Sequence, residues 1–381
     1  MTTIEPFVIE ASDSALADLR ERLSRTRWAD AETVSDWSQG VPLSYMQELR
    51  DYWLHDYDWR EREAQLNQFA QFTTRIDGLS IHFLHLRSPH QRATPLIMSH
   101  GWPGSFVEFS KVLGPLTDPV AHGGAPEDAF HVVCPSLPGF GFSEKPTETG
   151  CGVEQIADIW IALMKRLGYV KYVAQGGDWG SMITTAMAIR DPQHCQGIHL
   201  TMPIVTADPD TMNDLTEQEE SALAAWKQYK RWDHGYSSQQ STRPQSLAYG
   251  LVDSPVAQAA WVIEKFWSWT DCQGHPENAV SRDELIDNVM LYWLPATGGS
   301  SARIYWESWG TALQDPIAIP VAVSMFPKEI FRSSKRWCEK RFANLAYYNY
   351  LDKGGHFAAL EQPALFVREL RSAFTAIRDS Q

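Results

Sequence analysis

The spacing of apolar residues separates an opening helical stretch from a longer region of mixed structure. Within residues 12–28, Leu16, Leu19 and Leu23 share one face of a predicted amphipathic helix. Residues 44–68 predict further helix and are rich in Trp and Tyr. This leading stretch carries no nucleotide or metal motif, so we expect it to wrap the main body of the protein.

Strands and helices alternate after this stretch. Residues 69–87 predict a β-hairpin that turns at Asp77-Gly78. Apolar stretches then alternate with helical stretches, which is the pattern of a mainly parallel sheet covered by helices. The predicted strands are residues 95–99, 130–134, 172–175, 197–201, 318–325 and 344–351, and the predicted helices are residues 105–116, 153–167 and 363–377.

The alternation stops between about residues 203 and 314. This stretch is rich in Trp, Tyr and Gln, is mostly helical in pattern and is punctuated by Pro and Gly, so we interpret it as an inserted lid. The expected organisation is a helical meander over residues 1–68, a core over residues 69–202 and 315–381, and a helical lid over residues 203–314.

Composition excludes several classes of function. With 44% hydrophobic and 21% charged residues, the chain of 381 residues is predicted to be soluble and globular. Its net charge of −14 argues against nucleic acid or an anionic membrane as the main partner. The five cysteines form no Cys-x-x-Cys pair, so we expect no disulfide framework and no zinc site.

Targeting signals are also missing from the sequence. The first eleven residues have neither the basic nor the apolar segment of a signal peptide. No stretch of about 18 apolar residues occurs that could form a transmembrane anchor. We therefore expect a cytoplasmic protein.

The most informative motif is a glycine turn between a predicted strand and a predicted helix. Asp178 stands at the centre of Gly176-Gly177-Asp178-Trp179-Gly180, with glycines two residues before and two residues after it. This is the small-x-nucleophile-x-small spacing of a nucleophile elbow, in which glycines permit a strained turn and a close helix. Such elbows usually carry serine, whereas the central group here is a carboxylate.

A carboxylate at this place limits the chemistry. Attack on an acyl carbon would form a reactive anhydride, whereas displacement at an sp3 carbon forms an ordinary ester that water can cleave. Epoxides and alkyl halides are the two substrate classes that fit. The alternative is that the motif is only a turn with an acidic tip.

Further motifs occur where the partners of this nucleophile belong. His100-Gly101-Trp102-Pro103 follows a buried strand, so the backbone N–H groups of Trp102 and Trp179 are the candidate oxyanion hole. We expect His100 itself to be structural. His356 lies in a Gly-Gly turn after the last strand and is the candidate base that activates water.

Three carboxylates are candidates for the acid that orients His356. Glu329 is preferred, because it follows the preceding strand and because the order nucleophile, acid, histidine is that of the α/β-hydrolase fold. Glu361 lies after the histidine in chain order, and Asp352 lies at the foot of the histidine loop. A solvated surface carboxylate is the alternative for all three.

The chain resembles the microsomal-type epoxide hydrolases of the α/β-hydrolase superfamily, as a soluble, bacterial-like member without a membrane anchor. The resemblance implies an α/β-hydrolase fold with a mostly parallel eight-stranded sheet, flanking helices, an inserted helical lid and an N-terminal helical meander. The matching segments span nearly the whole chain: Thr26-Arg27-Trp28, Tyr57-Asp58-Trp59-Arg60, His100-Gly101-Trp102-Pro103-Gly104-Ser105, Pro135-Ser136-Leu137-Pro138-Gly139-Phe140-Gly141-Phe142-Ser143, Gly176-Gly177-Asp178-Trp179-Gly180, Thr242-Arg243-Pro244-Gln245, Glu264-Lys265-Phe266 and Gly354-Gly355-His356-Phe357-Ala358-Ala359-Leu360-Glu361.

The resemblance also implies two lid tyrosines that grip the epoxide oxygen. By position they are Tyr236, ahead of Thr242-Arg243-Pro244, and Tyr305. A phenol with a pKa near 10 stays protonated at neutral pH and can deliver a proton to the alkoxide that ring opening leaves. Packing within an aromatic-rich lid is the alternative role for each.

The predicted activity is hydrolysis of an epoxide to a vicinal diol through a covalent ester on Asp178, without cofactor or metal. A haloalkane dehalogenase with the same nucleophile and a non-catalytic homologue that binds a hydrophobic ligand are the alternatives. The aromatic-rich lid favours a bulky or aryl epoxide as the small-molecule partner. Detoxification, aromatic hydrocarbon catabolism, natural-product or antibiotic biosynthesis and a homodimeric state are all open.

Overall fold

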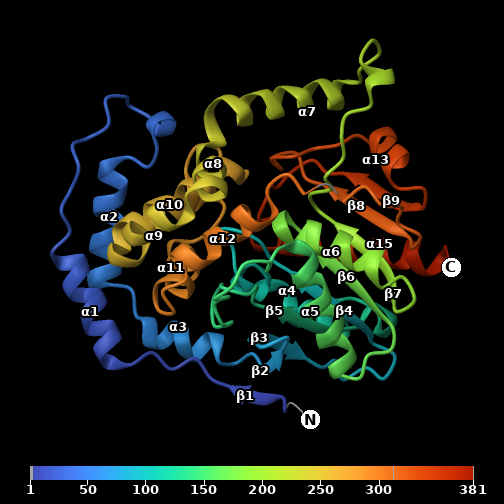
Figure 1. Cartoon of the computed structure of the whole chain (residues 1–381), viewed down its shortest axis with the longest axis horizontal. Helices are drawn as coiled ribbons and strands as arrows, with labels where there is room; N and C mark the ends of the chain where they lie inside the picture. Colours follow the sequence, from blue (N-terminus) through green and yellow to red (C-terminus); the bar gives the residue numbers. More distant parts are fainter. Residues whose placement is uncertain (1–2, 312, 381) are drawn as a thin grey trace.

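The core of the protein is one mixed β-sheet. The computed structural model describes residues 3–311 and 313–380, and within them nine strands form a sheet in the order β1-β2-β3-β5-β4-β6-β7-β8-β9 (Figure 1). Neighbours along β1-β2-β3-β5 pair antiparallel, and the remaining neighbours pair parallel. The strands are β1 (Glu5–Phe7), β2 (Gln71–Ile76), β3 (Leu79–Leu86), β4 (Thr94–Ser99), β5 (Phe130–Pro135), β6 (Tyr172–Gly176), β7 (Cys195–Leu200), β8 (Val321–Met325) and β9 (Leu345–Tyr350).

The predicted number of eight strands is wrong by one. The additional strand is β1, which pairs antiparallel with the first residues of β2 at the edge of the sheet. Its three residues are too few to show an alternating pattern, and their extended conformation depends on the partner strand. The leading region of the chain is therefore not purely helical.

Helices form in the intervals that the apolar spacing indicates, and also at residues 335–341 and 358–361, where none was predicted. They are α1 (Asp13–Ser24), α2 (Leu43–His55), α3 (Trp59–Leu66), α4 (Ser110–Thr117), α5 (Val153–Arg166), α6 (Asp178–Arg190), α7 (Glu217–Gln228), α8 (Gly235–Thr242), α9 (Pro244–Asp253), α10 (Pro255–Trp269), α11 (Arg282–Trp293), α12 (Gly298–Ser308), α13 (Lys335–Arg341), α14 (Ala358–Glu361) and α15 (Pro363–Asp379). Short 3-10 helices are η1 (Trp37–Gln39), η2 (Phe106–Phe109), η3 (Val120–His122), η4 (Pro126–Asp128), η5 (Pro209–Thr211) and η7 (Pro276–Asn278), and η6 (Tyr229–Asp233) is a π-helix.

Local capping explains where the predicted helical stretch of residues 44–68 divides. The carboxylate of Asp58 accepts a hydrogen bond from the backbone N–H of Arg60 at 2.8 Å, so Asp58 caps a new helix, α3. The chain therefore turns between α2 and α3 instead of continuing as one helix. The predicted helix of residues 12–28 likewise ends early, at Ser24.

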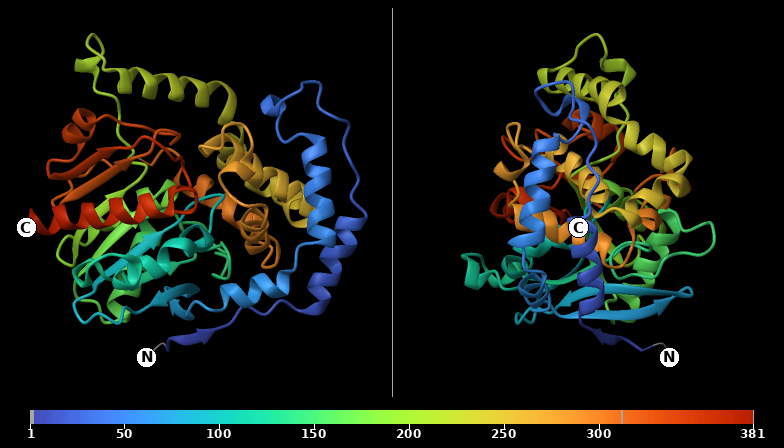
Figure 2. Two further views of the ribbon diagram at one scale, coloured as in Figure 1. Left: turned by 180° about the vertical axis from the view of Figure 1, so that it is seen from behind. Right: turned by 90° about the vertical axis from the view of Figure 1, so that its left-hand side faces the viewer.

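Helices cover both faces of the sheet. α5 and α6 contact each other on one face, and α4 and α15 contact each other on the other (Figures 1 and 2). In α5, Val153, Ile156, Trp160 and Leu163 are buried at helical spacing, which is why this segment packs on the sheet as a helix. Because both faces are covered, β6 and β8 are buried at every residue.

Helices α7 to α12 lie between β7 and β8 in the sequence. The N-terminal helices pack along one side of this group, where α1 and α2 contact α10 (Figures 1 and 2). The link is made by Asp287 of α11, which is buried and accepts hydrogen bonds from the Tyr57 hydroxyl at 2.7 Å and from the Arg62 guanidinium. The Tyr52 hydroxyl donates to Asp283 at 2.7 Å on the same helix. In the described part of the chain, none of the helices combines the length and apolar character needed to cross a membrane.

Candidate active site

The elbow places Asp178 in a left-handed backbone conformation with φ of 49°. β6 ends at Gly176 and α6 begins at Asp178, so the chain reverses within two residues. A β-carbon at Gly176 would lie 2.1 Å from the carbonyl oxygen of Gly180, and one at Gly180 would lie 2.0 Å from that of Ser99. Only glycine fits at these two positions, and a non-glycine residue with positive φ at the centre is the strained arrangement that the motif predicts.

One oxygen of Asp178 is held by the loop after β4. The backbone N–H of Trp102 donates a hydrogen bond of 2.8 Å to Oδ1 of the carboxylate. Trp179 lies in the first turn of α6, where backbone N–H groups have no acceptor within the helix. The two predicted oxyanion donors thus flank Asp178, one from each loop.

His356 connects this carboxylate to Glu329. Its Nε2 lies 3.4 Å from Oδ2 of Asp178, and its Nδ1 lies 2.7 Å from Oε1 of Glu329. The side chains of His356 and Glu329 are both buried. The other two candidate acids have different environments. Asp352 is exposed. Glu361 accepts hydrogen bonds from the backbone N–H groups of Phe357 at 2.9 Å and Asp271 at 2.8 Å.

The two carboxylates control the charge of His356. Burial opposes protonation of the imidazole, but the negative charges of Glu329 and Asp178 outweigh it and raise the pKa of His356 well above its ordinary value. The histidine is therefore paired as a cation with Asp178 while that carboxylate is charged. Loss of the charge on Asp178 removes part of this stabilisation.

His100 lies away from the cavity, within the core. Its Nδ1 lies 3.0 Å from the carbonyl oxygen of Gly101, and its Nε2 lies 3.3 Å from the backbone nitrogen of Leu137. Burial lowers the pKa of His100 to about 4, so the ring is neutral at neutral pH. It ties the loop after β4 to the loop after β5.

Helices α8 and α12 bring Tyr236 and Tyr305 together above the elbow. Their ring centroids are 5.7 Å apart, and both side chains are buried. Tyr236 stacks on Trp102 at 5.1 Å, and Tyr305 meets Trp179 edge-to-face at 4.8 Å. Burial raises the pKa of both phenols well above the ordinary value, so both keep their protons at neutral pH.

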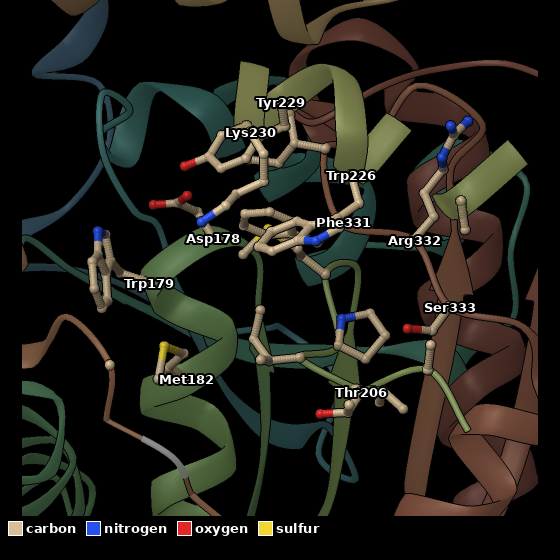
Figure 3. Close-up of a pocket in the computed structure, with 18 of the residues that line it drawn as sticks. Asp178, Trp179, Met182, Thr206, Trp226, Tyr229, Lys230, Phe331, Arg332 and Ser333 are labelled. Carbon is tan, nitrogen blue, oxygen red and sulfur yellow. The ribbon is translucent and has the colours of Figure 1, made fainter. Parts of the chain in front are cut away.

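A cavity of about 620 Å³ opens in front of Asp178. Figure 3 shows Asp178, Trp179 and Tyr229 at one end and Arg332 and Ser333 at the other. Its lining is mainly apolar and aromatic, and includes Met182, Ile204, Val205, Leu223, Trp226, Trp309, Phe331 and Trp337 together with Tyr236 and Tyr305. Such a lining with a few convergent polar groups is typical of a site for a small apolar ligand.

Several polar residues near this cavity were not predicted from the sequence, among them Tyr229 and Glu108. Tyr229 lines the cavity, with its hydroxyl 3.4 Å from that of Tyr236. Glu108 packs its carboxyl group against Gly104, and burial raises the pKa of Glu108 to about 8. Neither lies in a motif; η2, which carries Glu108, follows the Trp102 loop directly, and this proximity in sequence is the only signal that could have found it.

No cluster of three or more His, Cys, Asp or Glu side chains within residues 3–311 and 313–380 has an arrangement that could hold a metal ion. The polar groups around Asp178 include the phenols and the amine of Lys230, which line the cavity, and the backbone N–H of Trp102 (Figure 3). Their chemistry is hydrogen bonding to an oxygen and transfer of a proton.

Comparison with known proteins shows the family of this chain. Residues 4–109 match the family described as epoxide hydrolase N terminus, and residues 94–241 match the alpha/beta hydrolase fold. A protein of Stigmatella aurantiaca that carries the provisional name of an epoxide hydrolase is 54% identical over 98% of this chain and 86% of its own length. Epoxide hydrolase 1 of Sus scrofa is 36% identical over 97% of this chain and 88% of its own.

The chain belongs to the epoxide hydrolase family. Among solved structures, the epoxide hydrolase of Aspergillus niger superposes with a TM-score of 0.88 at 33% identity, over 99% of this chain and 96% of that one. The juvenile hormone epoxide hydrolase of the silkworm Bombyx mori superposes with a TM-score of 0.89 at 28% identity, over 100% and 96%. The likeness to these epoxide hydrolases extends over nearly the whole length of the chain.

Proposed function

We propose that the protein converts bulky, apolar epoxides into vicinal diols through a covalent ester on Asp178. The observation that carries the proposal is the position of the Asp178 carboxylate. Trp102 holds one of its oxygens at 2.8 Å, His356 lies behind it, and two phenols lie above it across the cavity. A nucleophile, a base and proton donors to an oxygen therefore surround one space.

In the first step, an oxygen of Asp178 attacks a carbon of the epoxide ring. The carbon–oxygen bond of the ring breaks, and the epoxide oxygen takes a proton from Tyr236 or Tyr305. The phenols matter because an unprotonated alkoxide is a poor leaving group in a dry cavity. The product is an ester between Asp178 and one carbon of the future diol.

In the second step, water attacks the carbonyl carbon of this ester. The ester carries no charge, so the pKa of His356 falls. The imidazolium then gives up its proton, which restores the tyrosine phenol that became a phenolate in the first step and leaves His356 neutral, as a base has to be. Glu329 holds Nδ1, so Nε2 is the atom that takes a proton from water. Backbone N–H groups of Trp102 and Trp179 stabilise the oxyanion until the diol leaves.

The size and chemistry of the cavity support a bulky substrate. A volume of about 620 Å³ exceeds that of a small aliphatic epoxide, and rings from the lid and the core line it. Trp226 and Phe331 lie far enough along the cavity to receive an aryl or branched substituent whose epoxide is at Asp178 (Figure 3), and Trp337 adds a further ring to the lining.

A trapping experiment tests the proposal. The His356→Gln variant, incubated with styrene oxide, is expected to gain the mass of one epoxide on the peptide that contains Asp178. The wild-type protein is expected to release the diol, and a single turnover in ¹⁸O water should place the label in Asp178 and leave the first diol unlabelled. Label in the first diol would contradict the ester.

Alkyl halides serve as the competing substrates. A haloalkane dehalogenase releases halide and needs no proton donor for its leaving group. We expect no halide release from chloroalkanes of matched size. If the protein released halide from chloroalkanes but formed no diol from epoxides, it would be a dehalogenase. If it bound these ligands but formed neither product, its role would be binding.

A further inference from the structure

A third tyrosine hydroxyl lies beside the two lid tyrosines. Tyr229 is buried, and its hydroxyl oxygen lies 3.4 Å from that of Tyr236 and 3.1 Å from Oγ of Ser237. It begins η6, the π-helix that joins α7 to α8. Such turns are rare and are often found at functional sites. Figure 3 shows Tyr229 at the same end of the cavity as Asp178.

The hydrogen-bond directions around Tyr229 follow from simple counting. Oγ of Ser237 donates its hydrogen to the carbonyl oxygen of His234 at 2.8 Å. A hydroxyl has one hydrogen to donate, so Oγ of Ser237 accepts the hydrogen of Tyr229. The oxygen of Tyr229 is then left to accept from Tyr236. At 3.4 Å this last contact is long for two hydroxyls and leaves room to tighten.

We infer that Tyr229 is a positioning residue, which orients the proton of Tyr236 at rest and donates a hydrogen bond to the Tyr236 oxygen after that proton has gone to the epoxide. The inference rests on the proposed function. In that step a bond forms between a carboxylate oxygen of Asp178 and a carbon of the epoxide ring. The bond between that carbon and the epoxide oxygen breaks, and the epoxide oxygen takes the proton of Tyr236. The negative charge passes to the phenolate of Tyr236, while Tyr229 turns its O–H and keeps its own proton.

Packing and charge both favour this role. The ring of Tyr229 meets Phe331 edge-to-face at 4.9 Å and stacks on Trp226 at 5.8 Å, so the ring is fixed and only its hydroxyl hydrogen has to turn. A buried phenolate at Tyr236 is unfavourable because burial raises the pKa of that phenol well above its ordinary value. A donor aimed at the new charge offsets part of this penalty.

The test compares tyrosine-to-phenylalanine variants in the His356→Gln background, where ester on Asp178 accumulates and its mass can be followed for hours. Tyr229→Phe should slow ester formation about tenfold, the loss expected for one hydrogen bond to a charged group. Affinity for the diol product should stay unchanged. The control is Tyr249→Phe, because Tyr249 is 67% exposed and is not among the residues that line the cavity.

Double variants separate this role from simple packing. If Tyr229 acts through Tyr236, Tyr229→Phe should have no further effect on Tyr236→Phe and its full effect on Tyr305→Phe. An equal effect in both backgrounds, or none in the single variant, would overturn the inference. Failure of every variant and of the parent to form ester would instead contradict the proposed function.

Discussion

A β-carbon at Gly101 would lie 2.1 Å from Oδ1 of Asp178. The absence of a side chain at Gly101 therefore lets the carboxylate reach the backbone N–H of Trp102, its hydrogen-bond donor at 2.8 Å. Gly101, in the loop after β4, therefore helps to fix the position of the Asp178 carboxylate, which lies on a different segment of the chain.

Gly101→Ala is expected to lower kcat/KM for an epoxide by about a hundredfold, the effect of losing one oxyanion donor. The new methyl group would push the carboxylate away from Trp102. Steady-state kinetics measure the loss. Gly250→Ala is the control, because a β-carbon there meets nothing within 4 Å, and it should leave kcat/KM unchanged. Normal activity of the Gly101 variant would argue against the role of this amide.

Glu329→Gln is expected to slow hydrolysis of the ester by at least about a hundredfold. The neutral amide cannot stabilise the histidine cation by charge, and it does not fix the hydrogen of the neutral ring on Nδ1. Ester formation should change less. Rapid-quench mass spectrometry of the Asp178 peptide separates the two rates. Asp352→Asn, at an exposed position, should leave both unchanged. If Asp352→Asn proved the more harmful, the acid would have to be reassigned.

The pKa of His356 should fall when Asp178 is neutral. The Asp178 carboxylate is one of the two charges that raise the pKa of His356. Removing a negative charge beside a cation favours loss of the proton, so Asp178→Asn should shift the titration of His356 to lower pH. NMR of the imidazole proton measures the shift, with intact mass checking that the asparagine persists. An unchanged or higher pKa would contradict the proposed switch from cation to base.

Tyr236→Phe and Tyr305→Phe should each slow ester formation by about a hundredfold, which is the lower range for a general acid. The double variant should form no ester on the time scale of the assay. Stopped-flow tryptophan fluorescence can follow the step, because Trp102 and Trp179 contact the two rings. If the variants formed the ester normally but failed to hydrolyse it, the assignment of the two tyrosines to ester formation would be wrong.

Arg62→Met should lower the free energy of unfolding by about 3 kcal/mol, because it leaves Asp287 as a buried charge with one partner fewer. Asp287 is buried in α11, so the effect should be loss of the contact between the N-terminal helices and the lid. Denaturant unfolding measures it. Arg25→Met, which breaks an exposed pair with Glu21, should change the free energy by less than about 0.5 kcal/mol.

Much of the fold could be predicted because its signals are local. The apolar spacing of α5 and α15, the turn at Asp77-Gly78 and the buried runs of the parallel strands depend on residues close in sequence. β1 could not be predicted, since its extended conformation depends on a strand more than 60 residues away. The break between α2 and α3 depends on a single cap at Asp58, which a periodic pattern does not resolve.

The sequence by itself determined the strained turn at Asp178, and it predicts the chemistry proposed for that carboxylate. An aspartate between glycines indicates displacement at carbon, and the order of Asp178, Glu329 and His356 along the chain indicates the fold that brings them together. Only the tertiary structure decided which groups meet. It distinguished Glu329 from Glu361 by their hydrogen-bond partners, and it placed Tyr229 against Tyr236. These contacts depend on how helices and loops pack against one another in space, and the spacing of residues along the chain does not specify that packing.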